Sequence, residues 1–223
     1  MVGRSITQIV IAPEPESPPM REALRAGIAV YNDGYHHAAH DAWEDRWLEL
    51  DADTADERLL HGLIQFTAAV YHARNRNWEG AVGLADSALE YLEELPATYR
   101  DVGLSRVRSY LECLAADPEV IERRPPIRVT HEGSVPGLEE LDVSATVLAA
   151  AVLAEELGYD EAPVETAGEY ALADLEAGRD DSRFIALLFA FVREADDRDV
   201  VYRRLTAHVS RRRSREEDVE GLF

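Results

Sequence analysis

The chain has 223 residues, of which 46% are hydrophobic, so it is long enough for one large domain or for a domain with a substantial extension. It is strongly acidic: 44 Asp and Glu residues against 23 basic residues give a formal net charge of −21. This charge argues against a general nucleic-acid binder, because neutralising phosphates needs a basic surface. No apolar run approaches the ~20 residues of a membrane span. The single cysteine, Cys113, excludes an internal disulfide, and we expect it to pack on the apolar side of its helix.

Every basic residue is arginine, and there is no lysine in the chain. This composition resembles that of the cytoplasmic proteins of salt-loving archaea. In molar salt the electrostatic screening length shrinks to about 3 Å, so the repulsion within an acidic surface is largely suppressed. The carboxylates keep the surface hydrated there, whereas in dilute buffer the same charge should loosen the fold. We therefore expect a soluble cytoplasmic protein of a haloarchaeon.

Proline and apolar periodicity divide the first part of the chain. Residues 1–19 hold four prolines and are predicted to be an N-terminal extension, with a short strand over 5–11. Asn32, Asp33 and Gly34 break the first helix, and Asp33 is the expected N-cap of the second. A helical domain over 20–116 follows from the predicted helices, which span 20–32, 35–50, 57–74, 78–94 and 102–115.

Residues 117–140 are rich in proline and lack a helical period, so we expect a linker there. A C-terminal helical region over 141–223 comes next, with predicted helices over 144–157, 161–178, 182–195 and 198–213. Ser144 and Ser182 are the expected N-caps, and the helix over 182–195 is apolar nearly all round, which predicts burial. The fold class is therefore all-α: an antiparallel helical bundle with additional C-terminal helices.

Polar residues of the second and third predicted helices form the candidate site. At 100° per residue, one arc of the second helix carries His36, His40, Trp43, Glu44 and Trp47. A stripe on the third helix carries Arg58, His61, Gln65 and His72. The short acidic turn between the helices favours antiparallel neighbours, so both stripes would face one cleft. Imidazoles and carboxylates in such a cleft could bind a divalent metal ion or act as general acids and bases. The alternative is that these histidines are purely structural, either exposed at a helix start or bonded to a carbonyl in the core.

Separate blocks of the same region occur in a distinctive order. They are Tyr31-Asn32-x-Gly34, His40-x2-Trp43-Glu44-x2-Trp47, Glu57-Arg58-x-Leu60-x-Gly62-Leu63-Ile64-Gln65, Tyr71-His72 and Asn77-x2-Gly80-Ala81. Over about residues 21–95 they resemble the family known as domain of unknown function 309. The resemblance implies a small antiparallel helical bundle with no established activity, and it places the polar positions of the family on Asn32, His40, Glu44, Gln65 and His72. Asp41 stands where the family usually has Glu, and His61 departs from its pattern, so His61 is not counted as a family ligand.

The predicted ligand-binding set is Asn32, His40, Trp43, Glu44, Trp47, Gln65 and His72. If a divalent metal is the cofactor, its predicted ligands are His40, Glu44 and His72. Three functions stay open: a cleft for a small ligand or protein partner, a metal-dependent hydrolase on the same residues, and an adaptor that docks partner helices or a second copy of itself. No catalytic residue is assigned and enzyme activity is undecided, because the HEXXH, P-loop and dinucleotide motifs are absent.

Overall fold

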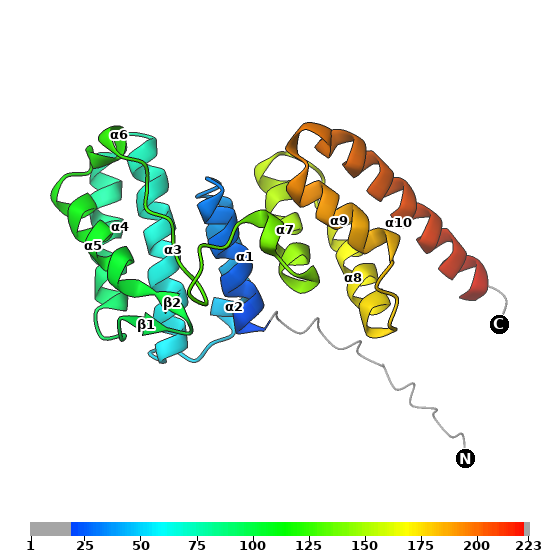
Figure 1. Ribbon diagram of the computed structural model, residues 1–223, viewed down its shortest axis with the longest axis horizontal. Coiled ribbons are helices and arrows are strands. Elements are labelled where there is room, and N and C mark those ends of the chain that lie inside the picture. The colour runs from blue at the N-terminus through cyan, green and yellow to red at the C-terminus, as the bar shows by residue number, and fades with distance from the viewer. Residues whose placement is uncertain (1–18, 221–223) are drawn as a thin grey trace, which may run out of the picture.

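The computed structural model describes residues 19–220, and this part of the chain is mainly helical (Figure 1). It contains ten α-helices, two short 3-10 helices and one two-stranded sheet, which confirms the all-α prediction. None of the described helices combines the length and the apolar character needed to cross a membrane. The strand predicted over 5–11 lies outside the described residues.

All five helices predicted for the first part of the chain are present. They are α1 (Met20–Asn32), α2 (Ala38–Leu48), α3 (Ala55–Arg74), α4 (Trp78–Leu92) and α5 (Leu104–Ala116). Between α4 and α5, β1 (Thr98–Tyr99) and β2 (Val102–Gly103) form an antiparallel hairpin. The two turn residues, Arg100 and Asp101, both have positive φ, as a tight two-residue hairpin requires.

The start of α2 differs from the prediction. Asp33 is the C-cap of α1, where its backbone N–H bonds to Ala29, and it is not the N-cap of α2. The chain first passes through a turn in which Gly34 has a φ of 101°, so α2 begins only at Ala38. The later caps follow ordinary chemistry: the side chains of Thr54 and Asn77 accept backbone N–H groups at the starts of α3 and α4.

The proline-rich segment predicted as a linker packs against the helices of the first part of the chain. It contains α6 (Val120–Arg123) and the 3-10 turn η1 (Leu138–Glu140), and between them Val129 and His131 are buried. His131 also forms an isolated β-bridge with Val102 of the hairpin. Cys113, expected to be packed, is exposed instead, because it lies beside the buried face of α5 and not on it.

The C-terminal part consists of α7 (Val143–Glu156), α8 (Ala162–Glu176), α9 (Arg183–Arg193), the 3-10 turn η2 (Ala195–Asp197) and α10 (Arg198–Glu220). Helix α7 contacts α1 and α2 on one side and α8 and α9 on the other. The α1–α2 pair therefore lies between the α3–α5 layer and the C-terminal helices (Figure 1). The domain limits at 116 and 141 stay a prediction.

The caps and burial of the C-terminal helices match the prediction only in part. Ser182 caps α9 as expected, and its hydroxyl accepts the N–H of Phe184. At α7 the cap is Asp142 and not Ser144, because the Asp142 carboxylate accepts the N–H of Ala145. Helix α9 buries one face, whereas Arg183 and Ala186 are exposed, so it is not buried all round.

Candidate functional site

Two of the predicted ligand residues have their polar atoms bonded to the backbone. Trp43 is 1% exposed; it packs on Gly27, and its indole N–H donates to the carbonyl of Ala23 at 2.9 Å. Asn32 holds the segment after α6 against α1: its amide donates to the carbonyls of Val129 and Pro136, and its oxygen accepts the N–H of Val129. Both residues therefore tie elements together.

Trp47 and His61 form a network of their own. The Trp47 indole donates to Oε1 of Glu57 at 2.9 Å, and the same oxygen lies 3.0 Å from Nδ1 of His61. The His61 ring stacks on Tyr91, with ring centroids 3.8 Å apart. The α2 and α3 stripes do meet here, but the contact is filled by side chains.

The remaining predicted residues do not come together as one set of metal ligands. Nδ1 of His72 accepts a hydrogen bond from the amide of Asn77 at 2.6 Å, next to the cap of α4. Glu44 is exposed, and Gln65 is half-buried. Among the described residues, the one group with metal-ligand spacing keeps His40 but includes neither Glu44 nor His72.

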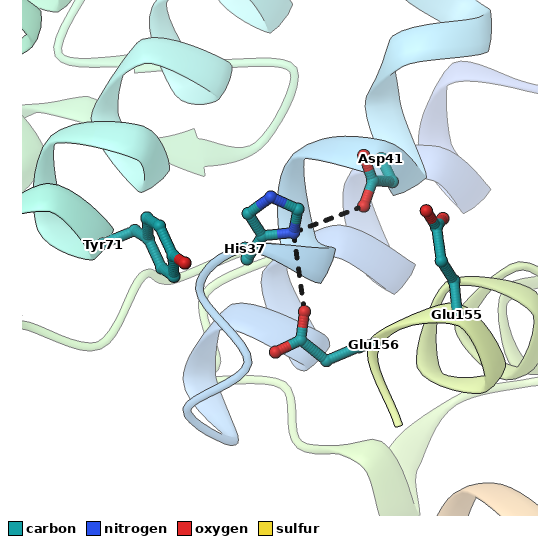
Figure 2. Close-up of a pocket in the computed structure, with 5 residues that line it drawn as sticks. All are labelled: His37, Asp41, Tyr71, Glu155 and Glu156. Carbon is teal, nitrogen blue, oxygen red and sulfur yellow. Dashed lines mark ion pairs between the residues drawn. The ribbon is translucent and has the colours of Figure 1, made fainter. Parts of the chain in front are cut away.

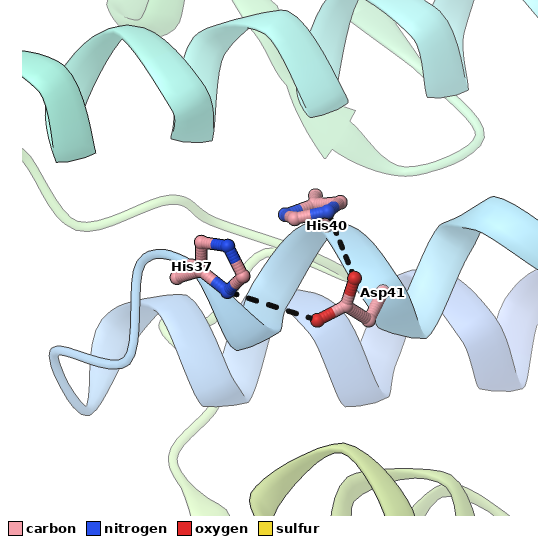
Figure 3. Close-up of side chains that lie close together, drawn as sticks. All are labelled: His37, His40 and Asp41. Atoms are coloured by element: carbon pink, nitrogen blue, oxygen red, sulfur yellow. Dashed lines mark ion pairs between the residues drawn. The ribbon is translucent and has the colours of Figure 1, made fainter. Parts of the chain in front are cut away.

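That group consists of His37, His40 and Asp41 at the start of α2 (Figure 3). One ligand atom of each residue lies within 4.8 Å of the others. Nε2 of His40 is 2.8 Å from one Asp41 oxygen, and Nδ1 of His37 is 4.0 Å from the other. Helical spacing places His40 and Asp41 on the same side as His37, since they follow it by three and four residues, and Asp41 is the chain neighbour of His40. The Asp41 carboxylate raises the pKa of His40 by hydrogen bonding to its charged form.

A pocket of about 290 Å³ opens beside this group (Figure 2). It is lined by His37 and Asp41 at the start of α2, Tyr71 of α3, and Glu155 and Glu156 at the end of α7. Oε2 of Glu156 lies 3.5 Å from Nδ1 of His37, and the Tyr71 ring lies 5.1 Å from the His37 ring. Three helices thus meet around one imidazole and three carboxylates, with no arginine in the lining, and a second imidazole, that of His40, lies against Asp41. Such a site favours a cation.

Sequence reasoning missed most of this lining. Under the structural alternative His37 would simply be exposed at the helix start; it is about half exposed, and it also lines the pocket. Asp41 was noted only as a departure from the family pattern. Glu155 and Glu156 carry no signal in the sequence, because they reach the pocket only through the packing of α7 on α2.

Comparison with known families identifies part of the chain. Residues 24–84 match the model of a family described as Domain of unknown function (DUF309). Over this range the chain is similar to the DUF309 family. The resemblance predicted from the sequence is thereby confirmed over a range narrower than 21–95. No curated protein matches the chain.

The DUF309 match runs from α1 into α4, so it contains three residues that line the pocket, His37, Asp41 and Tyr71, and also His40. The two glutamates of α7 lie outside it. The pocket therefore lies between the DUF309-like region and α7, a helix that the family model does not cover. Substitutions in α7 can test whether both parts contribute to one site.

Proposed function

We propose that this protein binds a divalent transition-metal ion, with Zn²⁺ as the first candidate, in the pocket between α2, α3 and α7. The observation that carries the proposal is the convergence of His37, His40 and Asp41 within 4.8 Å. Imidazole nitrogen and carboxylate oxygen are established ligands of Zn²⁺ and of similar ions.

The distances support this assignment. Donors that bind one tetrahedral Zn²⁺ at about 2.1 Å lie about 3.4 Å apart. The two imidazole–carboxylate distances at Asp41, 2.8 and 4.0 Å, bracket that value, so side-chain rotation alone can bring these groups to a common ion. Glu156, at 3.5 Å from His37, is placed to supply a fourth ligand from α7.

The other functions suggested by the sequence would use the same pocket. A small ligand or a partner side chain would meet His37, Asp41 and Tyr71 here, because the contact between α2 and α3 is filled. A metal-dependent hydrolase would need the ion first, together with a coordination position left open for water. Metal content should therefore be measured before ligand binding or hydrolase activity is tested.

The test is elemental analysis of protein purified in molar KCl without chelators or a histidine tag. We expect close to one equivalent of zinc or a similar metal per chain in the wild type. His37→Ala/His40→Ala should lose it, whereas His72→Ala should keep it, because His72 bonds to Asn77 away from the pocket. A third variant, Glu156→Gln, should weaken retention if α7 supplies a ligand.

Two results would contradict the proposal. One is wild-type protein that contains no metal and takes up none when dialysed against Zn²⁺. The other is equal metal content in the wild type and in His37→Ala/His40→Ala. Loss of metal from His72→Ala alone would instead favour the ligand set predicted from the sequence.

We further infer that the protein works in the cytoplasm of a salt-loving archaeon. The support is compositional: a net charge of −21, with arginine as the only basic residue type. At high salt such a surface stays hydrated while its self-repulsion is screened.

A further inference from the structure

A second pocket, of about 400 Å³, stands out because it is basic in a strongly acidic protein. It lies between the first turn of α9 and the second half of α10. Its lining is Arg183, Phe184, His208, Arg211, Arg212 and Arg215. No carboxylate is among these residues, although the chain carries 44 Asp and Glu residues.

Helical periodicity explains how α10 builds this surface. Positions 208, 211, 212 and 215 are spaced by three, four and seven residues, so they share one face of the helix. Arg183 faces them from the first residue of α9, and its guanidinium lies 3.4 Å from Nε2 of His208. Of the arginines in the run 211–215, Arg211, Arg212 and Arg215 line the pocket, whereas Arg213 pairs with Glu217 and is not in the lining.

Three of the pocket arginines are available to a ligand. Among the side chains described, those of residues 19–218, no carboxylate lies within ion-pair distance of Arg183, Arg211 or Arg215. The pKa of His208 is lowered by burial and by the positive charges of Arg211 and Arg183. The local potential is therefore positive despite the overall charge of the chain.

The fourth arginine forms a fixed wall. The Arg212 guanidinium lies 4.0 Å from the centre of the Tyr170 ring and bonds to Asp174 at 2.9 Å and to Glu216 at 3.1 Å. Because its charge is already paired with these carboxylates, Arg212 forms part of the pocket wall and contributes little to the attraction of an anion. The buried ring of Phe184 closes the pocket beside it.

We propose that this pocket binds the phosphate group of a small phosphorylated molecule. Arginine guanidinium groups match phosphate geometry with paired N–H donors, and unpaired arginines lose no existing ion pair on binding. The N-terminus of α9 opens onto the same space, and its dipole favours an anion there. A long polyanion is disfavoured, because beyond the pocket it would meet the acidic surface.

The experiment is isothermal titration of metal-free protein with inorganic pyrophosphate in molar KCl. Removing metal prevents an ion in the α2 pocket from contributing to the binding. We expect one equivalent to bind and Arg183→Gln/Arg211→Gln to weaken binding by about tenfold or more, equivalent to about 1.4 kcal/mol. The matched control, Arg203→Gln/Arg204→Gln, removes the same charge from exposed positions of α10 and should leave the affinity unchanged.

Three outcomes would overturn the proposal: wild-type protein that does not bind pyrophosphate, an equal loss in both double variants, or tighter binding of a single-stranded oligonucleotide than of pyrophosphate. The second would mean a diffuse charge effect, and the third a nucleic-acid surface. Thermal midpoints of both variants, measured in the same buffer, establish that each is folded.

Discussion

Acidification should destabilise the protein through His36, which lies in the turn before α2. The side chain is 7% exposed and meets the edge of the Tyr31 ring, with centroids 5.1 Å apart. Burial, together with the positive charge of Arg74, lowers the pKa of His36 from 6.5 to about 4. The folded protein therefore holds this imidazole neutral at pH values where the unfolded chain protonates it.

The direction and the size of the change in stability with pH follow from this difference in pKa between the folded and unfolded states. Above pH 6.5 both states are neutral, and His36 contributes no pH dependence. As the pH falls from 6.5 towards 4, the unfolded state binds the proton first, so stability decreases. Between pH 7 and pH 5 the loss amounts to about 2 kcal/mol, a range in which most carboxyl groups stay ionised. His40 acts in the opposite direction, because Asp41 raises its pKa.

His36→Phe isolates this contribution, because it keeps an aromatic ring in place and removes the titration. The free energy of unfolding, from denaturant titrations at pH 7 and pH 5, should fall by about 2 kcal/mol less in the variant than in the wild type. All other titrating groups are shared and cancel in the comparison. An equal fall in both proteins, or an NMR titration midpoint of His36 near 6.5, would refute the reasoning.

Two further predictions concern packing and salt. Gly27→Ala should cost about 1–3 kcal/mol, because the added Cβ would overlap the Trp43 indole, whereas Gly83→Ala, with open space around it, should stabilise α4 by up to about 1 kcal/mol. Denaturant titration of both variants tests the pair, and equal effects would count against the packing argument. The thermal midpoint should be higher in molar KCl than in dilute buffer; an unchanged midpoint would contradict the inferred adaptation to salt.

Apolar periodicity was a reliable guide to the helices, because a helix buries one face and its sequence must repeat accordingly. Caps were harder to predict. Asp33 and Ser144 have the chemistry of N-cap residues, but so do their neighbours, and the actual cap of α7 is Asp142, two residues before Ser144. Side-chain chemistry permits a cap at several positions, and the path of the chain into the helix selects one.

The candidate site shows the same limit. His40 was identified from the stripe on α2, and the structure pairs it with Asp41 on the same helical turn. The predicted companions Glu44 and His72 are not part of the group with metal-ligand spacing that the structure forms around His40. Residue spacing shows which side chains share a face of one helix. It does not show which faces of two helices meet, and here the contact between α2 and α3 is occupied by the rings of Trp47 and His61, with Tyr91 stacked on His61.

The sequence by itself determined that this protein is a strongly acidic, helical chain with a DUF309-like region, because charge, helical period and motif order are all local properties. Only the tertiary structure decided where its candidate sites lie. Glu156 reaches His37, and Arg183 reaches His208, through contacts between helices that are distant or separate in the sequence. Those contacts depend on how buried faces pack together, and no pattern within a single helix specifies its partner.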